Sequence, residues 1–350
     1  MKLKKRILVA PLNWGLGHAT RCIPIINALL EYSFEPIIAS DGAALELLKK
    51  EFSSLKHIEL PSYKISYSDK GENLKLRLLK DAPKALRAIK NEKKQVKELV
   101  GSLKIDGIIS DNRFGVYNKK IPSVFITHQL NVLSGNTTRL SSKMHQKIIS
   151  KFDECWVPDV EGQLNLSGKL GHVENSSLKV KYIGSISRFN KLNITNKYNL
   201  MVLLSGPEPQ RTLLEEHLLI ELSKYKGSVL FVRGLVEPIQ SKTKNDNITL
   251  VNFMQSIELE QAIAESELIL SRSGYTTLLD LSKMEKKAFF IPTPGQFEQE
   301  YLAQRLDDKK ISPFCAQDKF TLDELKRVSF YSGFKSIKSE TNFEKLFSLF

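Results

Sequence analysis

The chain has 350 residues, of which 41% are hydrophobic and 26% are charged, and these proportions are typical of a soluble globular protein. This length predicts two domains, each able to bury its own core. No apolar run is long enough to span a bilayer, and Met1 leads through basic residues into an expected strand, so we expect a cytoplasmic protein. The three cysteines are odd in number and widely spaced, which argues against a disulfide framework and a zinc site.

The net charge of +13 is compatible with nucleic acid, an anionic membrane surface or an anionic substrate, and also with a lysine-rich surface that only keeps the protein soluble. Much of this charge lies in the basic, partly amphipathic region 64–104, which we expect to be helical. Helices of this kind bind anionic membranes, although a solvated charged face is the commoner case.

The first half alternates short apolar runs with helical periodicity, which predicts an α/β domain over residues 1–160. The strands expected in it are 6–12, 36–40, 57–60, 105–110, 122–127 and 155–158.

A glycine-containing turn follows the first expected strand. Gly15 and Gly17 lie in this turn, and His18 lies at or just before the first turn of the next helix. The helix dipole disfavours the imidazolium there, and a neutral histidine can accept a proton at physiological pH. We therefore predict that His18 is a general base, against the alternative that it only hydrogen-bonds the loop. Thr20 stands where a dinucleotide fingerprint needs its third glycine or alanine, which disfavours dinucleotide binding.

Polar side chains also follow two later strands of this half. Asp111 and Asn112 follow one strand, and His128 and Gln129 follow the other. Ligands of a doubly wound sheet bind beyond the carboxyl ends of its strands, so we predict acceptor binding at this edge, although each residue alone could be a cap or a turn. The predicted acceptor-binding residues are Asn13, Gly15, Gly17, Arg21, Asp111, Asn112 and His128.

The second half repeats the alternation after a Gly, Asn and Ser-rich stretch that predicts an interdomain crossing at 161–183. We expect a second Rossmann-like domain at 184–330 and a helical tail at 331–350 that docks back on the first domain. Two facing sheets of this type leave a cleft between them. The predicted fold class is therefore α/β, with two facing Rossmann-like domains and an interdomain cleft.

The stretch 271–303 carries the clearest chemical signal. An apolar strand ends in Ser273-Gly274 and a helix follows, which is an arrangement that binds phosphate through backbone N–H groups and the helix dipole. A second strand ends at Pro292, and the loop behind it is rich in Gln and Glu, which suits sugar hydroxyls. The two loops are expected to lie side by side at one sheet edge.

This stretch resembles the C-terminal donor domain of family 28 glycosyltransferases, which have the GT-B fold. The superfamily includes the peptidoglycan lipid-linked N-acetylglucosaminyltransferase and the plant galactolipid synthases. The turn from Gly15 to Arg21 resembles the N-terminal glycine loop of the same superfamily. The similarity covers most of the chain and is specific mainly in these two stretches.

The resemblance implies that His18 is the general base and that a nucleotide sugar is the donor. Residues 253–254 match the segment that reads the base, residues 205–206 lie near the diphosphate, and residues 273–276 cradle it. Arg188 is expected to assist there. The implied donor-binding residues are Arg188, Ser205, Gly206, Phe253, Met254, Ser273, Gly274, Tyr275, Thr276, Asp280, Gln296, Glu298 and Gln299.

Two positions depart from the family pattern. Asp280 stands where the family usually has a glutamate that bonds the ribose, and the side chain of Asp280 is shorter by one methylene group. Glu300 replaces the second glutamine of the peptidoglycan enzyme's pair, next to the sugar-holding Gln296, Glu298 and Gln299, so the same sugar specificity does not follow.

These features predict an inverting hexosyl transfer from a UDP-sugar to an acceptor hydroxyl. No paired acidic motif for a metal stands at a strand end, so we expect neither a metal nor another cofactor beyond the nucleotide-sugar co-substrate. The acceptor is expected to be lipid-linked at the inner face of the membrane, which would make the protein peripheral there, and no nucleic-acid partner is expected. The alternatives are a nucleotide-sugar 2-epimerase of the same fold, a binding protein that has lost catalysis, and a basic nucleic-acid-binding protein.

Overall fold

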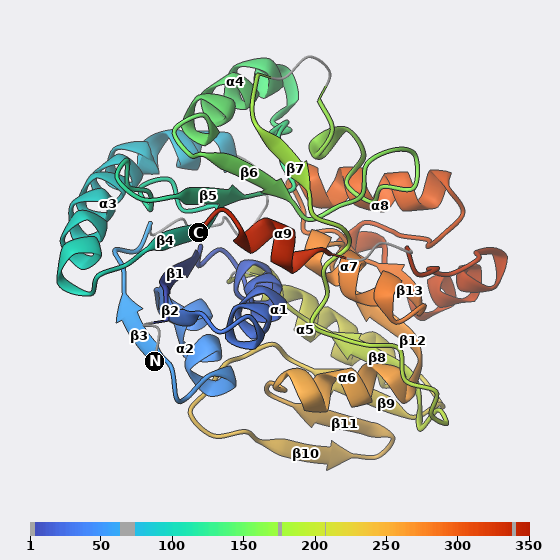
Figure 1. The fold of residues 1–350 in the computed structure, drawn as a ribbon. Coiled ribbons are helices and arrows are strands. Elements are labelled where there is room, and N and C mark those ends of the chain that lie inside the picture. Colours follow the sequence, from blue (N-terminus) through green and yellow to red (C-terminus); the bar gives the residue numbers. More distant parts are fainter. Residues whose placement is uncertain (1–3, 64–73, 174–176, 207, 338–340) are drawn as a thin grey trace. The chain divides into compact units, whose positions relative to one another are not determined.

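The computed structural model describes residues 4–63, 74–173, 177–206, 208–337 and 341–350 (Figure 1). Contacts divide the chain into two compact units. Of the described residues, unit 1 comprises those within 4–63, 78–188 and 341–350, and unit 2 comprises those within 74–77 and 189–337. Part of the predicted basic region, residues 64–73, lies outside the described residues.

Unit 1 contains a parallel sheet of seven strands in the order β3-β2-β1-β4-β5-β6-β7. The strands are β1 (Arg6–Pro11), β2 (Glu35–Ser40), β3 (Lys56–Glu59), β4 (Gly107–Asp111), β5 (Ser123–Ile126), β6 (Glu154–Val157) and β7 (Val180–Tyr182). The helices are α1 (Gly17–Glu31), α2 (Gly42–Glu51), α3 (Leu74–Ser102), α4 (Thr138–Ile149) and α9 (Phe343–Phe347), with 3-10 turns at Gly135–Thr137 and Gly168–Leu170.

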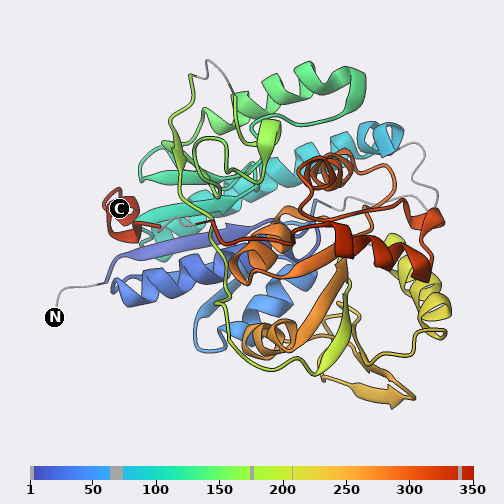
Figure 2. The ribbon, with the colours of Figure 1, turned by 90° about the vertical axis from the view of Figure 1, so that its right-hand side faces the viewer.

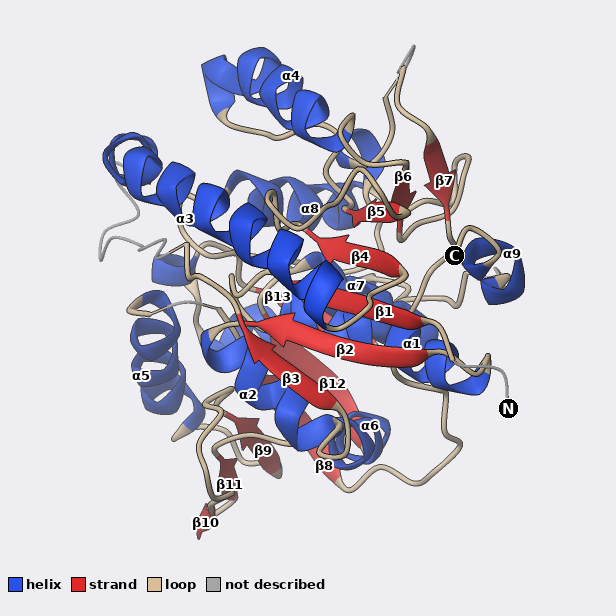
Figure 3. Cartoon of the chain, turned by 60° about the vertical axis from the view of Figure 1, so that its left-hand side comes forward, coloured by secondary structure: helices blue, strands red, loops and turns tan. Residues whose placement is uncertain are grey.

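The central strands of unit 1 are buried on both faces. In β1, Ile7, Leu8 and Val9 have no exposed surface, as expected of a parallel sheet covered by crossover helices. Figure 3 shows α3 lying along one face of this sheet, where Val96 joins the core cluster of Leu8. The strand order reverses between β1 and β4, so their carboxyl ends form the switch point where ligands of such sheets bind.

Unit 2 contains six strands in the order β10-β11-β9-β8-β12-β13, all parallel except the antiparallel edge strand β10. The strands are β8 (Tyr198–Leu203), β9 (Val229–Val232), β10 (Lys242–Asn245), β11 (Ile248–Val251), β12 (Ser266–Ser271) and β13 (Lys287–Phe290). The helices are α5 (Gln210–Leu222), α6 (Ser256–Ala264), α7 (Tyr275–Lys283) and α8 (Phe297–Asp308), with 3-10 turns at Gln317–Lys319 and Leu322–Phe330. Its switch point lies between β8 and β12.

The end of the first domain differs from the prediction. We expected its last strand at 155–158 and an interdomain crossing at 161–183, but β7 pairs in parallel with β6 and completes the sheet of unit 1. The division into units falls between Arg188 and Phe189. The strand β7 has three half-buried residues at a sheet edge, so it lacks the apolar pattern that identifies a strand in a sequence.

The C-terminal segment packs on unit 1. Phe347 of α9 contacts the rings of Tyr32, Phe34 and Trp156, and Phe350 contacts Trp156. Figure 2 shows α9 beside the N-terminal strand and helix. In the described part of the expected helical tail at 331–350, only α9 is helical, and residues 331–337 are irregular. Among the described residues, no helix is both long and apolar enough to cross a membrane.

Candidate functional site

The glycine turn presents His18 at the carboxyl end of β1. The strand ends at Pro11, Gly15 adopts a φ of +74°, and α1 begins at Gly17. A positive φ favours glycine, which explains Gly15 at the point where the chain reverses. His18 is therefore the second residue of α1, and 15% of its side chain is exposed.

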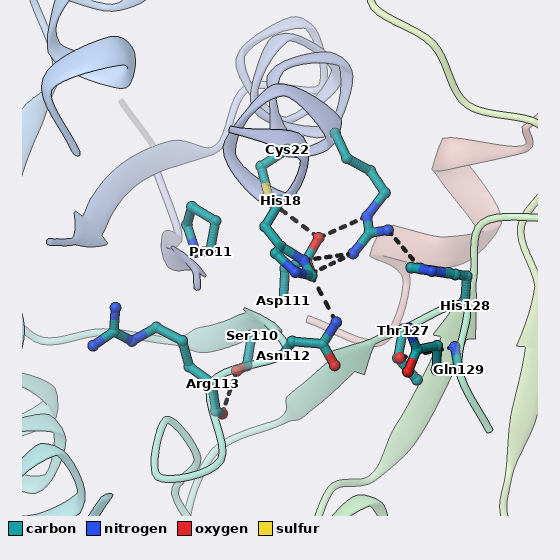
Figure 4. Close-up of polar contacts among 12 residues, drawn as sticks. Pro11, His18, Cys22, Ser110, Asp111, Asn112, Arg113, Thr127, His128 and Gln129 are labelled. Atoms are coloured by element: carbon teal, nitrogen blue, oxygen red, sulfur yellow. Dashed lines mark hydrogen bonds and ion pairs between the residues drawn. The ribbon is translucent and has the colours of Figure 1, made fainter. Parts of the chain in front are cut away.

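Asp111, the last residue of β4, holds the His18 ring. Its Oδ1 lies 2.7 Å from His18 Nδ1 (Figure 4). The same carboxylate accepts hydrogen bonds from Arg21, with Nε 2.8 Å from Oδ2, and Cys22 Sγ lies 3.8 Å from Oδ2. The register of β4 on β1 pairs Pro11 with Asp111, so the sheet itself brings this carboxylate to the glycine turn.

The charge of Arg21 keeps Asp111 ionised. Burial by itself raises the pKa of the Asp111 carboxyl, but the Arg21 guanidinium and His18 outweigh burial and lower that pKa to about 2. Burial and the Asp111 charge raise the pKa of the Cys22 thiol, so Cys22 is a packed thiol and not a nucleophile.

The contacts of His18 select one tautomer. An ionised Asp111 only accepts, so the 2.7 Å contact requires a proton on Nδ1. Arg21 Nη2 lies 3.0 Å from His18 Nδ1, but it also donates to Asp111 Oδ1, which is a charged and nearer acceptor. With the proton on Nδ1, His18 Nε2 carries a lone pair and can accept a proton.

Asn112 and His128 complete this group. Asn112 adopts a φ of +57° and its Nδ2 lies 3.5 Å from His18 Nδ1. Arg21 Nη1 donates to His128 Nδ1 at 3.0 Å, which leaves the proton of a neutral His128 on Nε2. The structure thus brings together five of the predicted residues from the ends of β1, β4 and β5: Arg21, His18, Asp111, Asn112 and His128.

Two of the predicted acceptor-binding residues are buried. Asp111 has no exposed surface and Arg21 is 2% exposed. Each contacts a histidine of this group, Asp111 Oδ1 at 2.7 Å from His18 Nδ1 and Arg21 Nη1 at 3.0 Å from His128 Nδ1. Acceptor binding by Asp111 and Arg21 stays a prediction. Asn13 Nδ2 donates to Asp41 Oδ2 at 3.3 Å, and Asn13 Oδ1 accepts from the backbone N–H of Ala44. Asn13 therefore connects the glycine turn to the start of α2. Acceptor binding by Asn13, Gly15, Gly17, Asn112 and His128 stays a prediction.

The predicted phosphate loop of unit 2 follows β12. Gly274 is the N-cap of α7, and no side chain caps this helix in the described chain. A Cβ added to Gly274 would meet nothing nearer than Thr277 Oγ1 at 3.9 Å, and Gly206, with a φ of +107°, also faces open space. Packing therefore does not explain Gly274, whereas the close approach of a ligand to the backbone would.

The side chains of this loop are mostly used internally. Ser273 Oγ donates to the carbonyl of Gln299 at 2.8 Å, and Ser273 and Tyr275 are buried. Any phosphate contact of these two residues would therefore use backbone N–H groups. Thr276 is half-buried.

The predicted sugar-binding loop follows Pro292 and leads into the first turn of α8. Gln299 Oε1 accepts from the backbone N–H of Thr293 at 2.8 Å, so this buried side chain shapes the loop. Gln296 is the N-cap residue of α8, and its Oε1 is buried with no hydrogen-bond partner within the described residues. A buried acceptor without a donor is costly, and a ligand hydroxyl would satisfy it. Glu300 accepts from the backbone N–H of Gly295 at 3.0 Å, so it stabilises the turn of this loop.

The other predicted donor-binding residues of unit 2 are mostly buried. Phe253 and Met254 follow β11 and are 5% and 7% exposed. Asp280 is 6% exposed within α7, and Glu298 lies in the first turn of α8. Arg188 is in unit 1, where its guanidinium lies 4.0 Å from Glu51. The donor contacts of these residues, and of Ser205, stay predictions.

Sequence reasoning assigned no role to Arg272, which directly precedes the phosphate loop. Its guanidinium is 2% exposed and donates to the carbonyls of Ile291, Pro292 and Gln210 and to the side chain of Gln317. Its position at the end of a strand was the available signal. Within the ranges that the structure describes, no group of three or more His, Cys, Asp or Glu side chains is arranged to hold a metal ion.

The chain is similar in sequence to known glycosyltransferases. Residues 211–329 match the model of the glycosyltransferase family 28 C-terminal domain. A UDP-N-acetylglucosamine--N-acetylmuramyl-(pentapeptide) pyrophosphoryl-undecaprenol N-acetylglucosamine transferase from Natranaerobius thermophilus is 25% identical over 231 residues, which cover 62% of this chain and 60% of that protein. The protein of the same name from Clostridium tetani is 22% identical over 366 residues, covering 96% of this chain and 97% of its own length.

Solved structures establish the fold. The glycotransferase of kitacinnamycin superimposes with a TM-score of 0.62 at 11% identity, covering 93% of this chain and 89% of that chain. A putative UDP-N-acetylglucosamine 2-epimerase from Listeria monocytogenes reaches 0.52 at 10% identity, covering 93% and 88%. Two Rossmann-like units of this kind define the GT-B fold, which confirms the predicted α/β class with two Rossmann-like domains. Residues 211–329 lie within unit 2, and their match to the family 28 model, together with the two relatives, confirms the predicted resemblance to that family.

Proposed function

We propose that this chain is a metal-independent, inverting glycosyltransferase that moves a hexosyl group from a UDP-sugar to an acceptor hydroxyl. The observation that carries the proposal is the contact of His18 Nδ1 with the buried carboxylate of Asp111 at 2.7 Å. This contact gives His18 the tautomer and orientation that a general base needs.

The reaction is a single displacement at the anomeric carbon. His18 Nε2 takes the proton of the acceptor hydroxyl as its oxygen bonds to the anomeric carbon, and the bond from that carbon to the nucleotide diphosphate breaks. The ionised Asp111 stabilises the imidazolium that forms. Attack opposite to the leaving group inverts the configuration of the anomeric carbon.

Unit 2 would bind the donor. The match of residues 211–329 to the family 28 domain supports this assignment, as do the open space at Gly274 and the unpartnered acceptor of Gln296. The first of the two relatives is matched over only 60% of its length, and both names specify UDP-N-acetylglucosamine as the donor. We take a UDP-sugar from these names as the first donor class to test.

The acceptor is proposed to be lipid-linked, as in the names of both relatives. Unit 1 offers a surface for the lipid on α4, where one exposed stripe combines apolar and basic residues. This α4 stripe consists of Arg139, Leu140, Lys143, Met144 and Lys147. Leu140 and Met144 are 63% and 61% exposed. A helix of this composition lies at an anionic membrane surface, which would make the protein peripheral to the membrane.

The 2-epimerase shares the fold, so the fold alone does not separate the two activities. The family 28 domain match and the base at the acceptor edge favour transfer. An epimerase would convert a UDP-sugar to an isomeric UDP-sugar without any acceptor. A nucleic-acid-binding protein would instead show steep salt-dependent DNA binding and no affinity for UDP.

The test is an assay of the full chain with a panel of UDP-hexoses and the lipid-linked acceptor that the relatives' names specify, in the presence of EDTA. The proposal predicts UDP release, a glycosylated lipid and an inverted anomeric configuration by NMR. Activity that disappears with EDTA and returns with manganese would contradict the metal-independent mechanism.

A further inference from the structure

Arg272 differs from the other buried arginines of the described chain in its partners. Four arginines are classed as buried: Arg21, Arg113, Arg211 and Arg272. Arg21 pairs with Asp111, Arg113 with Asp41 and Glu92, and Arg211 with Glu208 and Glu215. The guanidinium of Arg272 donates to the oxygen atoms of three backbone carbonyls and one side-chain amide, and no described carboxylate forms an ion pair with it.

These four contacts hold three loops at one edge of the unit 2 sheet. Arg272 Nη1 donates to Ile291 and Pro292 at 3.0 Å, after β13 and before the sugar loop. Its Nη2 donates to the first residue of α5, Gln210, at 2.9 Å and to Gln317 Oε1 at 2.6 Å. Arg272 therefore fixes the surroundings of Ser273 and Gly274, which follow it directly.

The contacts satisfy the donors but leave the positive charge uncompensated. Burial lowers the pKa of Arg272 to about 9, so the group is charged at neutral pH. A buried charge is normally paired, because the interior solvates it poorly. The same interior transmits its field to nearby groups with little screening. The helix α7 begins at Tyr275, three residues after Arg272, and its N-terminus adds a positive dipole end.

We propose that Arg272, which directly precedes the Ser273-Gly274 turn, is a positioning residue whose uncompensated charge favours the diphosphate of the donor and stabilises it as it leaves. The inference rests on the proposed function of unit 2 as the donor site. Because the side chain is 2% exposed, it acts through the field and through the loops and does not touch the ligand.

The substitution Gln317→Glu tests the role of this charge while keeping the hydrogen bonds of Arg272 to the surrounding loops. Gln317 Oε1 already accepts from Arg272 at 2.6 Å, and a glutamate of the same length keeps that hydrogen bond while neutralising the guanidinium. We would titrate full-length wild type, Gln317→Glu and the uncharged control Gln317→Met with UDP and with uridine by calorimetry, and record thermal unfolding of each.

The proposal predicts that Gln317→Glu melts at or above the wild-type temperature and that its Kd for UDP rises about tenfold or more, while its Kd for uridine is unchanged. Gln317→Met, which keeps the charge uncompensated, should bind UDP within about threefold of wild type. Equal UDP affinity of wild type and Gln317→Glu would overturn the role of Arg272. Failure of wild type to bind UDP would instead overturn the proposed donor site, and this inference with it.

Discussion

The carboxylate of Asp111 lies 2.7 Å from Nδ1 of His18 and also pairs with Arg21, so one buried anion orients the proposed base and neutralises the cation beside it. In the proposed mechanism, Asp111 acts by orienting His18. A carboxylate with no exposed surface can act only through the groups that it holds.

Replacing Asp111 by Asn should therefore lower kcat more than it raises KM. An amide can donate to His18 Nδ1, which would place the ring proton on Nε2 and abolish the base. We expect a loss of about a hundredfold or more in kcat, with UDP affinity within about twofold of wild type. Steady-state kinetics and calorimetry measure both quantities. If Asp111→Asn kept the wild-type kcat, the contact between Asp111 and His18 would not be what makes His18 a base.

The same carboxylate should make stability depend on acid pH. Because the pKa of Asp111 is lowered from 3.8 to about 2 in the folded chain, its contribution is fully present above about pH 4 and is lost as the pH falls toward 2. The shift corresponds to about 2 kcal/mol in the free energy of unfolding. Urea unfolding of wild type and Asp111→Asn between pH 3 and 5 should show their difference shrink at the lower pH; a constant difference would contradict the lowered pKa.

Gly274→Ala should fold normally and bind UDP weakly. A Cβ at Gly274 has open space, and its φ of −70° suits any residue, so we expect the free energy of unfolding to stay within about 1 kcal/mol of wild type. The added methyl group would stand where the diphosphate approaches the backbone. Thermal unfolding and UDP titration separate the two effects.

Gly234→Ala is the matched control for a glycine that the fold requires. It has a φ of +73°, and a Cβ there would clash with the carbonyl oxygen of Leu204. This variant should lose about 1–3 kcal/mol of stability. If Gly274→Ala binds UDP as tightly as wild type, the phosphate-loop assignment is wrong.

Gln296→Leu should lose the sugar contact without losing stability. The Oε1 of Gln296 is buried and has no hydrogen-bond partner in the ranges described, so its removal leaves no protein donor unsatisfied. We expect a melting temperature at or above that of wild type and weaker binding of the UDP-sugar, with UDP binding unchanged. Calorimetric titration with both ligands checks this, and equal loss for UDP and UDP-sugar would remove Gln296 from the sugar site.

The α4 stripe should bind anionic vesicles. Lys143 and Lys147 are exposed on it, and each basic residue near such a surface contributes about 1 kcal/mol, so Lys143→Gln/Lys147→Gln should weaken binding to phosphatidylglycerol vesicles about thirtyfold. Lys242→Gln/Lys244→Gln removes the same charge from the exposed edge strand β10 and should have little effect. Equal loss in both double variants would show that net charge alone drives binding.

Much of the fold was visible in the sequence because parallel strands are apolar on both faces. Runs such as 6–12 and 105–110 identify buried strands, and the order of elements identifies two Rossmann-like sheets. The half-buried edge strand β7 carries no such pattern, and neither does the antiparallel β10, whose residues are all exposed.

The sequence predicted which residues lie together at the carboxyl ends of the strands, but it did not show which of their side chains are buried. Strand-end position identified His18, Asp111 and His128, and the parallel register brings them together. Position could not show that Asp111 is buried beneath His18, since burial depends on side-chain packing between β1, β4 and α1. The hydrogen bonds of Arg272 could not be predicted either, because their acceptors come from three segments that are distant in the sequence.

The most direct test of the account is the rate of UDP release from the UDP-hexose that wild type uses, with lipid-linked acceptor and EDTA, in wild type and His18→Ala. We expect His18→Ala to lose about 10²- to 10⁴-fold in kcat while its Kd for UDP stays within about twofold of wild type. A variant that releases UDP and glycosylates the acceptor at the wild-type rate would contradict His18 as the base, and with it the mechanism proposed for this chain.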